Sequence, residues 1–144
     1  MLILYKDLWE SDKILKVVSD NNWTDSDTDV LLDCTLKEIK SLLLDCIAQN
    51  DKCILLLDCN KGEVPPLFYL GKCVTFLLGI KQDIIKGVHF SMVYDKQKNA
   101  TKWIDIILKM YTPARPLFTV STKTEINKLI TDRNIIDFNY KLTE

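Results

Sequence analysis

The stretch Cys53-Ile54-Leu55-Leu56-Leu57 is the most sharply bounded apolar run in the chain, and Asp58-Cys59-Asn60-Lys61-Gly62 follows it directly. A short apolar run that ends in Asp, Asn and Gly is typical of a buried strand leading into a loop at the edge of a sheet. Open α/β sheets bind ligands at the carboxyl ends of their strands. The loop after Asp58 is therefore the first place to look for a functional site.

The residues near the amino terminus predict a hairpin and a loop. Two β-prone runs, Leu2–Tyr5 and Ile14–Val18, are separated by polar residues at 10–13, which predicts a β-hairpin. Residues 21–29 are rich in Asn, Asp, Ser and Thr and predict a loop, with Trp23 packed down as its anchor.

Apolar residues spaced three and four apart predict an amphipathic helix that begins at Thr35. Thr35 and Glu38 have the spacing of a capping box, and Asn50-Asp51 mark the end of the helix. The apolar positions of this helix are Leu36, Ile39, Leu42, Leu43, Cys46 and Ile47.

A second helix is predicted from Pro65 and Pro66 to about Lys86, with Gly79 as the place where it could break. The alternating, aromatic segment Val88–Tyr94 predicts the next strand. A third helix would carry Trp103, Ile104, Ile107, Leu108 and Tyr111.

The last elements follow two prolines. Pro113 and Pro116 end the third helix, and Leu117–Val120 predicts a final core strand. Ser121 or Thr122 would then cap a short helix.

This order predicts an α/β fold: a single mixed sheet opened by a β-hairpin, with parallel strands joined by right-handed crossovers and helices packed on the sheet. A chain of 144 residues that is 47% hydrophobic suits a single domain, which we assign to residues 1–132. Residues 133–144 form a C-terminal tail, for which an edge strand and a docking arm both remain open.

Charge and hydropathy exclude several classes of protein. With 19 basic and 20 acidic residues, the chain has a net charge of -1 and no field that would attract nucleic acid. Its apolar stretches are shorter than the roughly 18 residues of a membrane span, and the amino terminus has no signal-peptide pattern. We expect a soluble, cytoplasmic protein.

Cysteine and histidine give no metal or cofactor pattern. The five cysteines include no Cys-x-x-Cys pair, and His89 is the only histidine. We expect reduced, mostly buried thiols, a core or edge position for His89, and neither a metal nor a cofactor.

The order of elements resembles that of the STAS domains, the family of the bacterial anti-sigma-factor antagonists and of the cytoplasmic tails of sulfate transporters. The resemblance covers roughly Leu2 to Ile130 and rests on the opening hairpin, Ile54–Asp58, the helix after Pro66, the strand at Val88 and above all Pro116–Ile126. It implies a non-enzymatic regulatory module that binds a protein. In that family, the loop after the matching strand leads to a helix whose amino-terminal serine is phosphorylated by a partner kinase, which switches binding off.

The chain departs from that pattern at the switch, because no hydroxyl residue lies between Asp58 and Leu67. The resemblance still implies a partner-binding surface made of Asp58, Asn60, Lys61 and Glu63, together with the exposed side of the following helix. A helix amino terminus behind a rigid loop offers free N–H groups for docking. The simpler interpretation is that Asp58 only caps the helix or fixes the loop.

If the chain were an enzyme, its catalytic residues would lie at the carboxyl ends of the strands, where the candidates are Asp58, Cys59, Asp95, Ser121 and Thr122. A receiver-like domain would use Asp58 as phosphoacceptor, but Asp7 alone supplies little charge for Mg²⁺. Cys59 as a nucleophile would have only Lys61 to lower its pKa. We therefore expect no catalytic residues.

Two further binding alternatives remain. The chain could be a homodimer, or it could be a structural subunit of a larger assembly in which Ile135 to Tyr140 forms a docking strand that adds to a neighbour's sheet. Lipid carriage is not expected, since a chain this short needs its apolar residues for its own core.

Overall fold

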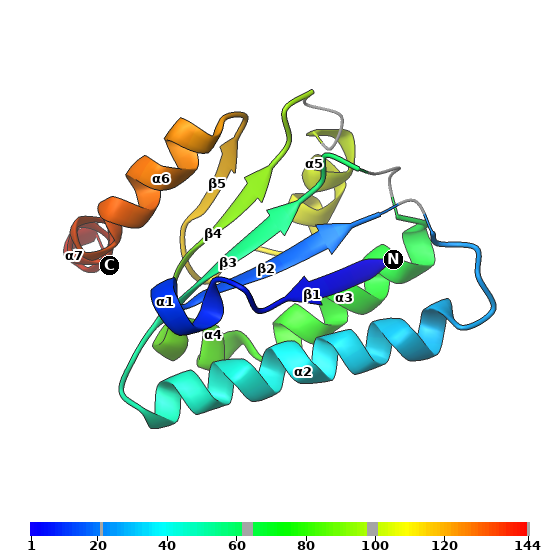
Figure 1. Cartoon of the computed structure of the whole chain (residues 1–144), viewed down its shortest axis with the longest axis horizontal. Helices are drawn as coiled ribbons and strands as arrows, with labels where there is room; N and C mark the ends of the chain where they lie inside the picture. The colour runs from blue at the N-terminus through cyan, green and yellow to red at the C-terminus, as the bar shows by residue number, and fades with distance from the viewer. Residues whose placement is uncertain (21, 62–64, 98–100, 144) are drawn as a thin grey trace.

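The computed structural model describes residues 1–20, 22–61, 65–97 and 101–143 and contains one five-stranded mixed sheet with helices packed on it (Figure 1). The strands are β1 Leu2–Tyr5, β2 Ile14–Ser19, β3 Cys53–Asp58, β4 Val88–Tyr94 and β5 Leu117–Val120. The helices are α1 Trp9–Asp12, α2 Thr28–Ala48, α3 Leu67–Gly79, α4 Lys81–Gly87, α5 Thr101–Met110, α6 Lys123–Thr131 and α7 Arg133–Thr143. The predicted α/β fold class is confirmed.

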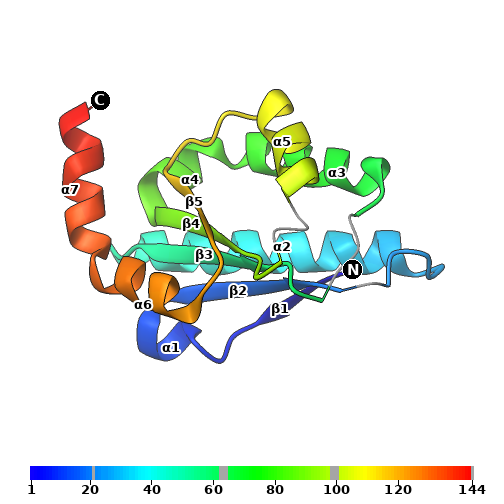
Figure 2. The same ribbon diagram turned by 90° about the horizontal axis from the view of Figure 1, so that it is seen from above.

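The strands lie in the sheet in the order in which they follow along the chain. β1 is antiparallel to β2, as the predicted hairpin requires, and β2 to β5 are parallel. When each parallel strand is added on the same side of the one before it, right-handed crossovers place all the connecting helices on the same face of the sheet. Accordingly, α2 to α5 cover one face of the sheet and α6 lies on the other (Figures 1 and 2), while α1 contributes Trp9 to the core of the first face.

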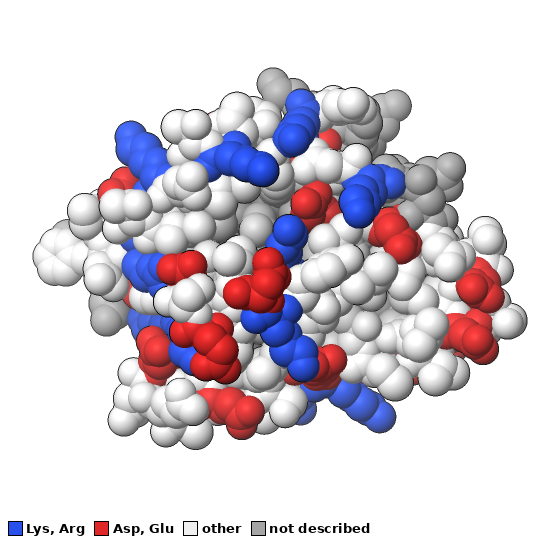
Figure 3. All heavy atoms as spheres, in the orientation of Figure 1, with Lys and Arg blue, Asp and Glu red and all other residues white. Residues whose placement is uncertain are grey.

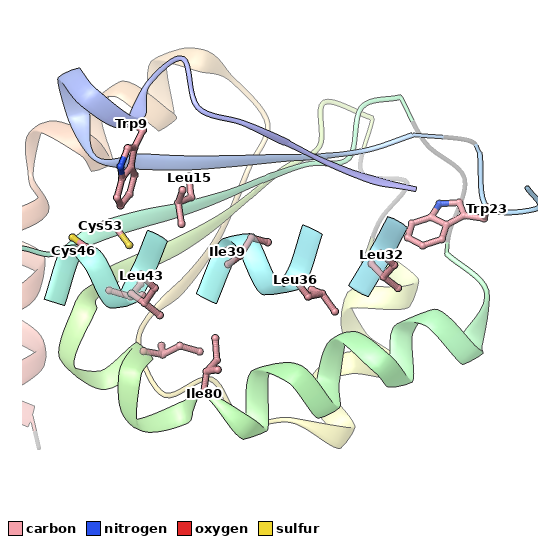
Figure 4. Close-up of a cluster of buried hydrophobic side chains, with 12 residues drawn as sticks. Trp9, Leu15, Trp23, Leu32, Leu36, Ile39, Leu43, Cys46, Cys53 and Ile80 are labelled. Atoms are coloured by element: carbon pink, nitrogen blue, oxygen red, sulfur yellow. The ribbon is translucent and has the colours of Figure 1, made fainter. Parts of the chain in front are cut away.

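The core on the first face lies between the sheet and helices α2 and α4. Leu36, Ile39 and Leu43 of α2 point into it, while Trp9 and Trp23 lie near its two ends (Figure 4). Trp23 is buried and its ring lies 5.4 Å from that of Tyr69, so the predicted anchoring of the loop by this residue is confirmed.

The core on the second face is built mainly from the sheet and helix α6. Its fully or nearly fully buried members from the strands are Ile14, Ile54, Leu56, Phe90, Met92, Tyr94 and Val120. Ile126 of α6 packs against them. Thr122 caps this helix by accepting a hydrogen bond from the N–H of Glu125 at 3.2 Å, which confirms one of the two predicted caps.

Helix α2 begins at Thr28, so the prediction of a start at Thr35 was wrong. The three consecutive apolar residues Val30-Leu31-Leu32 obscure the helical period, since only Leu32 is buried. Thr35 lies inside the helix, where its hydroxyl donates to the carbonyl oxygens of Leu31 at 3.0 Å and Leu2 at 3.3 Å. A threonine that bonds back to the preceding turn of a helix is not a cap.

Two other expectations concern the later elements. The second predicted helix does break at Gly79, where α3 ends and α4 follows after Ile80. The C-terminal tail forms helix α7, so it provides neither the edge strand nor the docking strand expected at Ile135 to Tyr140. The side chain of Trp103 lies outside the described part of the structure.

Replacing Gly87 with alanine tests the close packing of α4 on α2. An added Cβ would lie 2.6 Å from Ile47 Cγ1 and 2.7 Å from Leu43 Cδ1, well inside van der Waals contact. We expect Gly87→Ala to lower the free energy of unfolding by about 1–3 kcal/mol in urea denaturation. Gly71→Ala is the matched control, because nothing lies within 4 Å of that position and alanine favours a helix by up to about 1 kcal/mol. Equal stability of the two variants would contradict the packing described.

Candidate functional site

The carboxyl ends of the parallel strands form one edge of the sheet. The strand register aligns Val18 with Asp58, Asp58 with Tyr94, and Tyr94 with Val120. Beyond the strands, the N–H of Cys59 donates to Tyr94 O at 2.9 Å and that of Asp95 donates to Val120 O at 3.0 Å. The predicted alignment of Asp58, Cys59, Asp95, Ser121 and Thr122 along this edge is therefore confirmed.

Asp58 and Asn60 fix the loop after β3. Asp58 Oδ1 accepts hydrogen bonds from the backbone N–H of Asn60 at 3.0 Å and from its side-chain amide at 2.9 Å. Asn60 Oδ1 in turn accepts from the backbone N–H of Lys96 at 2.7 Å, which links this loop to the one after β4. Asp58 makes no capping bond to α3, whose N-cap residue is Pro66. Its carboxylate thus orders the start of the loop, at residues 58–60.

Lys61 extends the site toward the end of β2. It is exposed, and its charge helps to lower the pKa of Asp20, although the N–H of Asn22, which donates to Asp20 Oδ1 at 2.9 Å, is the main cause. The amino group of Met1 also lies 3.3 Å from Asp20 Oδ1. Glu63, the fourth residue of the predicted surface, lies outside the described residues.

Cys59 is poorly suited to act as a nucleophile. Burial, reinforced by the charges of Asp95 and Asp58, raises the pKa of its thiol to about 12. A thiol with such a pKa is almost entirely protonated at neutral pH, and the thiolate is the reactive form. The burial of Cys59 and the two nearby carboxylates therefore argue against a nucleophilic role for its thiol.

The acidic residues needed by a receiver-like site are not brought together. Asp7 follows β1, and β1 runs antiparallel to β2, so Asp7 lies at the end of the sheet opposite to Asp58. Among the described residues, no three His, Cys, Asp or Glu side chains are grouped so that they could hold a metal ion.

The start of α3 exposes two large apolar side chains next to this loop. Leu67 is 68% exposed and Phe68 is 66% exposed. They border a groove between α2 and α3 that Leu36, Lys37, Lys40 and Phe76 also line. Lys72 of α3 ties the two helices together through ion pairs with Asp29 and, at 2.9 Å, with Asp33. The exposed apolar residues thus lie on one of two helices that ion pairs join.

Acidic and basic groups are intermixed on the face of the molecule shown in Figure 3, and no large region of one sign dominates it. Binding of nucleic acid usually requires a continuous basic surface. This face provides none.

A second polar cluster, which the sequence did not predict, lies at the opposite edge of the sheet. Asp137 of α7 is buried and its carboxylate lies 2.6 Å from His89 Nδ1, 2.5 Å from Arg115 Nη2 and 3.3 Å from Lys52 Nζ. Arg115 also donates from Nε to Val88 O at 3.0 Å and from Nη2 to His89 O at 3.1 Å.

This cluster holds α7 on the sheet. Burial lowers the pKa of His89, with the neighbouring Asp137 acting in the opposite direction. The Arg115 guanidinium lies 4.3 Å from the centre of the Tyr140 ring, and the Tyr140 hydroxyl donates to Ala114 O at 2.9 Å. Because the Asp137 carboxylate is shared among three basic side chains, we assign the cluster a structural role, in line with the core position expected for His89.

Comparison of the chain with protein-family models, with curated proteins and with solved structures finds no match. In the described part of the chain, every helix is too short or too polar to cross a lipid bilayer.

Removing the Asp137 carboxylate tests the role of the second cluster. Asp137→Ala leaves Arg115 buried without its acidic partner, and we expect a loss of about 3–5 kcal/mol in the free energy of unfolding. Asn134→Ala, at an exposed position of the same helix, should change it by less than about 0.5 kcal/mol. Thermal or urea denaturation measures both, and similar values for the two would show that Asp137 does not hold α7.

Thiol alkylation tests the environment of Cys59. Treatment of the folded protein with iodoacetamide should modify the exposed Cys34 first and leave Cys59 largely unmodified, because burial and two nearby carboxylates suppress its thiolate. Peptide mass spectrometry at successive times gives the two rates. Labelling of Cys59 as fast as that of Cys34 would revive the nucleophile hypothesis.

Proposed function

We propose that the chain is a non-enzymatic, regulatory protein-interaction module similar to a STAS domain, and that it binds a protein through the loop after β3 and the start of α3. The observation that carries this proposal is the pair of exposed apolar side chains, Leu67 and Phe68, at the first turn of α3. Adjacent exposed apolar residues that border a groove are typical of an interaction surface.

The rest of the surface supplies rigidity and charge. Hydrogen bonds between Asp58 and Asn60 order the first residues of the loop, which lowers the entropy lost when they bind a partner. The exposed side chains of Lys37 and Lys40 line the groove beside the apolar pair. A complementary partner would present an apolar side chain flanked by acidic ones. A second copy of the chain would form a homodimer through the same surface.

Ser121 and Thr122 are weak substitutes for the missing phosphorylated serine. Both hydroxyls donate to Glu125 Oε1, at 3.1 and 3.0 Å, and Thr122 caps α6. These bonds lower the pKa of Glu125 and keep a carboxylate beside the two hydroxyls. Regulation of this module would therefore act through occupancy of the surface at α3 and not through a phosphoryl group on α6.

A second candidate function is that of a structural subunit docked through its C-terminal segment. In helix α7, Ile135 is 61% exposed and Phe138 is 63% exposed, so this helix also offers an apolar surface to another chain. This candidate uses a different helix from the proposed surface, and mutations can separate the two.

The test compares Phe68→Asp with Phe138→Asp in the full chain. The two phenylalanines are almost equally exposed, so neither change should unfold the protein. Native mass spectrometry reports self-association, and quantitative affinity purification reports other partners. We expect Phe68→Asp to weaken binding by about 2 kcal/mol or more, while Phe138→Asp leaves it intact.

The reverse pattern would favour the structural subunit docked through α7. Binding that survives both substitutions would contradict both proposals.

A further inference from the structure

An apolar chamber that is partly open to solvent lies between the first face of the sheet and the helices that cover it, chiefly α2, α3 and α5. It has a volume of about 220 Å³. Its walls include Leu55 and Leu57 of β3, Leu70 and Cys73 of α3, and Ile107 of α5. It shares Leu36 and Phe76 with the groove that Phe68 borders, but Phe68 itself does not line it.

The burial of β3 gives independent evidence for this space. β3 is the middle strand of the sheet and has helices on both faces. On the second face, its Ile54 and Leu56 are 0% and 6% exposed. On the first face, Leu55 and Leu57 of the same strand are only partly buried. Side chains at the centre of a packed interior are normally sealed from solvent, so the first face is incompletely filled.

Small side chains account for part of the unfilled volume. Ser91 of β4 lies opposite Leu55 of β3 and Leu117 of β5, and it lines the chamber. Its side chain is smaller than those of these neighbours and leaves space that a larger apolar side chain would fill. Cys73 lies in the opposite wall, and burial raises the pKa of its thiol to about 11, which keeps it uncharged.

The lining selects against a charged ligand. Arg115 is the one basic or acidic side chain among the described residues that line the chamber, and its guanidinium is already bound to Asp137 and to two backbone carbonyl groups. Trp23 also lines the chamber, and its indole N–H is buried without a hydrogen-bond partner in the described structure. Water in such a space would find few polar partners.

We propose that this chamber is a binding site for an uncharged, largely apolar small molecule of one or two rings or of similar hydrocarbon bulk. An apolar cavity of about 150 Å³ is sufficient to hold benzene. The chamber is larger, so a two-ring aromatic molecule fits its volume. This site differs in place and in ligand from the surface proposed for protein binding.

A titration followed by methyl NMR tests the site. Benzene, indole and xenon are added separately to the full chain. We expect saturable shifts of the Leu55, Leu57 and Ile107 methyl signals and little change at Ile54, which lies on the other face of the sheet. Xenon reports an open apolar space whatever the shape of the natural ligand. No saturable shift with any probe, or shifts confined to Leu67, would overturn the proposal.

A pair of serine variants provides the matched control. Ser91→Leu should fill the chamber, raise the melting temperature and abolish the shifts caused by indole. Ser19→Leu places the same side chain at a fully buried position that does not line the chamber, and it should lower the melting temperature. A Ser91→Leu variant that is destabilised as much as Ser19→Leu would show that no space exists. Phe68→Asp should leave indole binding unchanged, so failure of this proposal and failure of the proposed function are distinguishable.

Discussion

The parallel pairing of β2 to β5 in chain order is the constraint on which the rest of the structure depends. Each crossover advances in the same direction, so right-handed connections bring α2, α3, α4 and α5 to the same face. Several helices then share one side of a narrow sheet. Helices α2 and α4 pack closely at Gly87, and farther along the same face the chamber opens between the sheet and helices α2, α3 and α5. The start of α3, with Leu67 and Phe68, remains on the surface.

The same constraint leaves the second face of the sheet to the end of the chain. Among the described residues, the crossover helices lie on the first face, and α6 supplies side chains that close the core of the second. Helix α7 is held by Asp137, whose carboxylate sits among His89, Arg115 and Lys52. Burying an ionised carboxylate is costly unless its partners are close and well oriented. Basic side chains from three separate segments offset this cost. Together they fix the position of α7.

Local patterns predicted most of the fold, because apolar runs, prolines and the Thr122 cap act over a few residues. The start of α2 was mispredicted, since Val30 and Leu31 are exposed and Thr35 imitates a cap. The Asp137 cluster joins residues 22 and 48 positions apart, and no local pattern encodes such a pairing. At the candidate site, the sequence located Asp58, Asn60 and Lys61 correctly at the strand edge. It did not reveal that Asp58 bonds to Asn60, nor how far Phe68 is exposed.

In the proposed function, the start of α3 is the contact surface, with the hydrogen-bonded residues Asp58 and Asn60 on one side and helix α2, joined to α3 by ion pairs, on the other. Site-specific photo-crosslinking tests this most directly. A photoreactive amino acid replaces Phe68 in one sample and the equally exposed Phe138 in another, and crosslinking is done in cells. We predict a discrete crosslinked protein, or a crosslinked second copy, from position 68 alone. Crosslinks from position 138 only, or none from position 68, would contradict it.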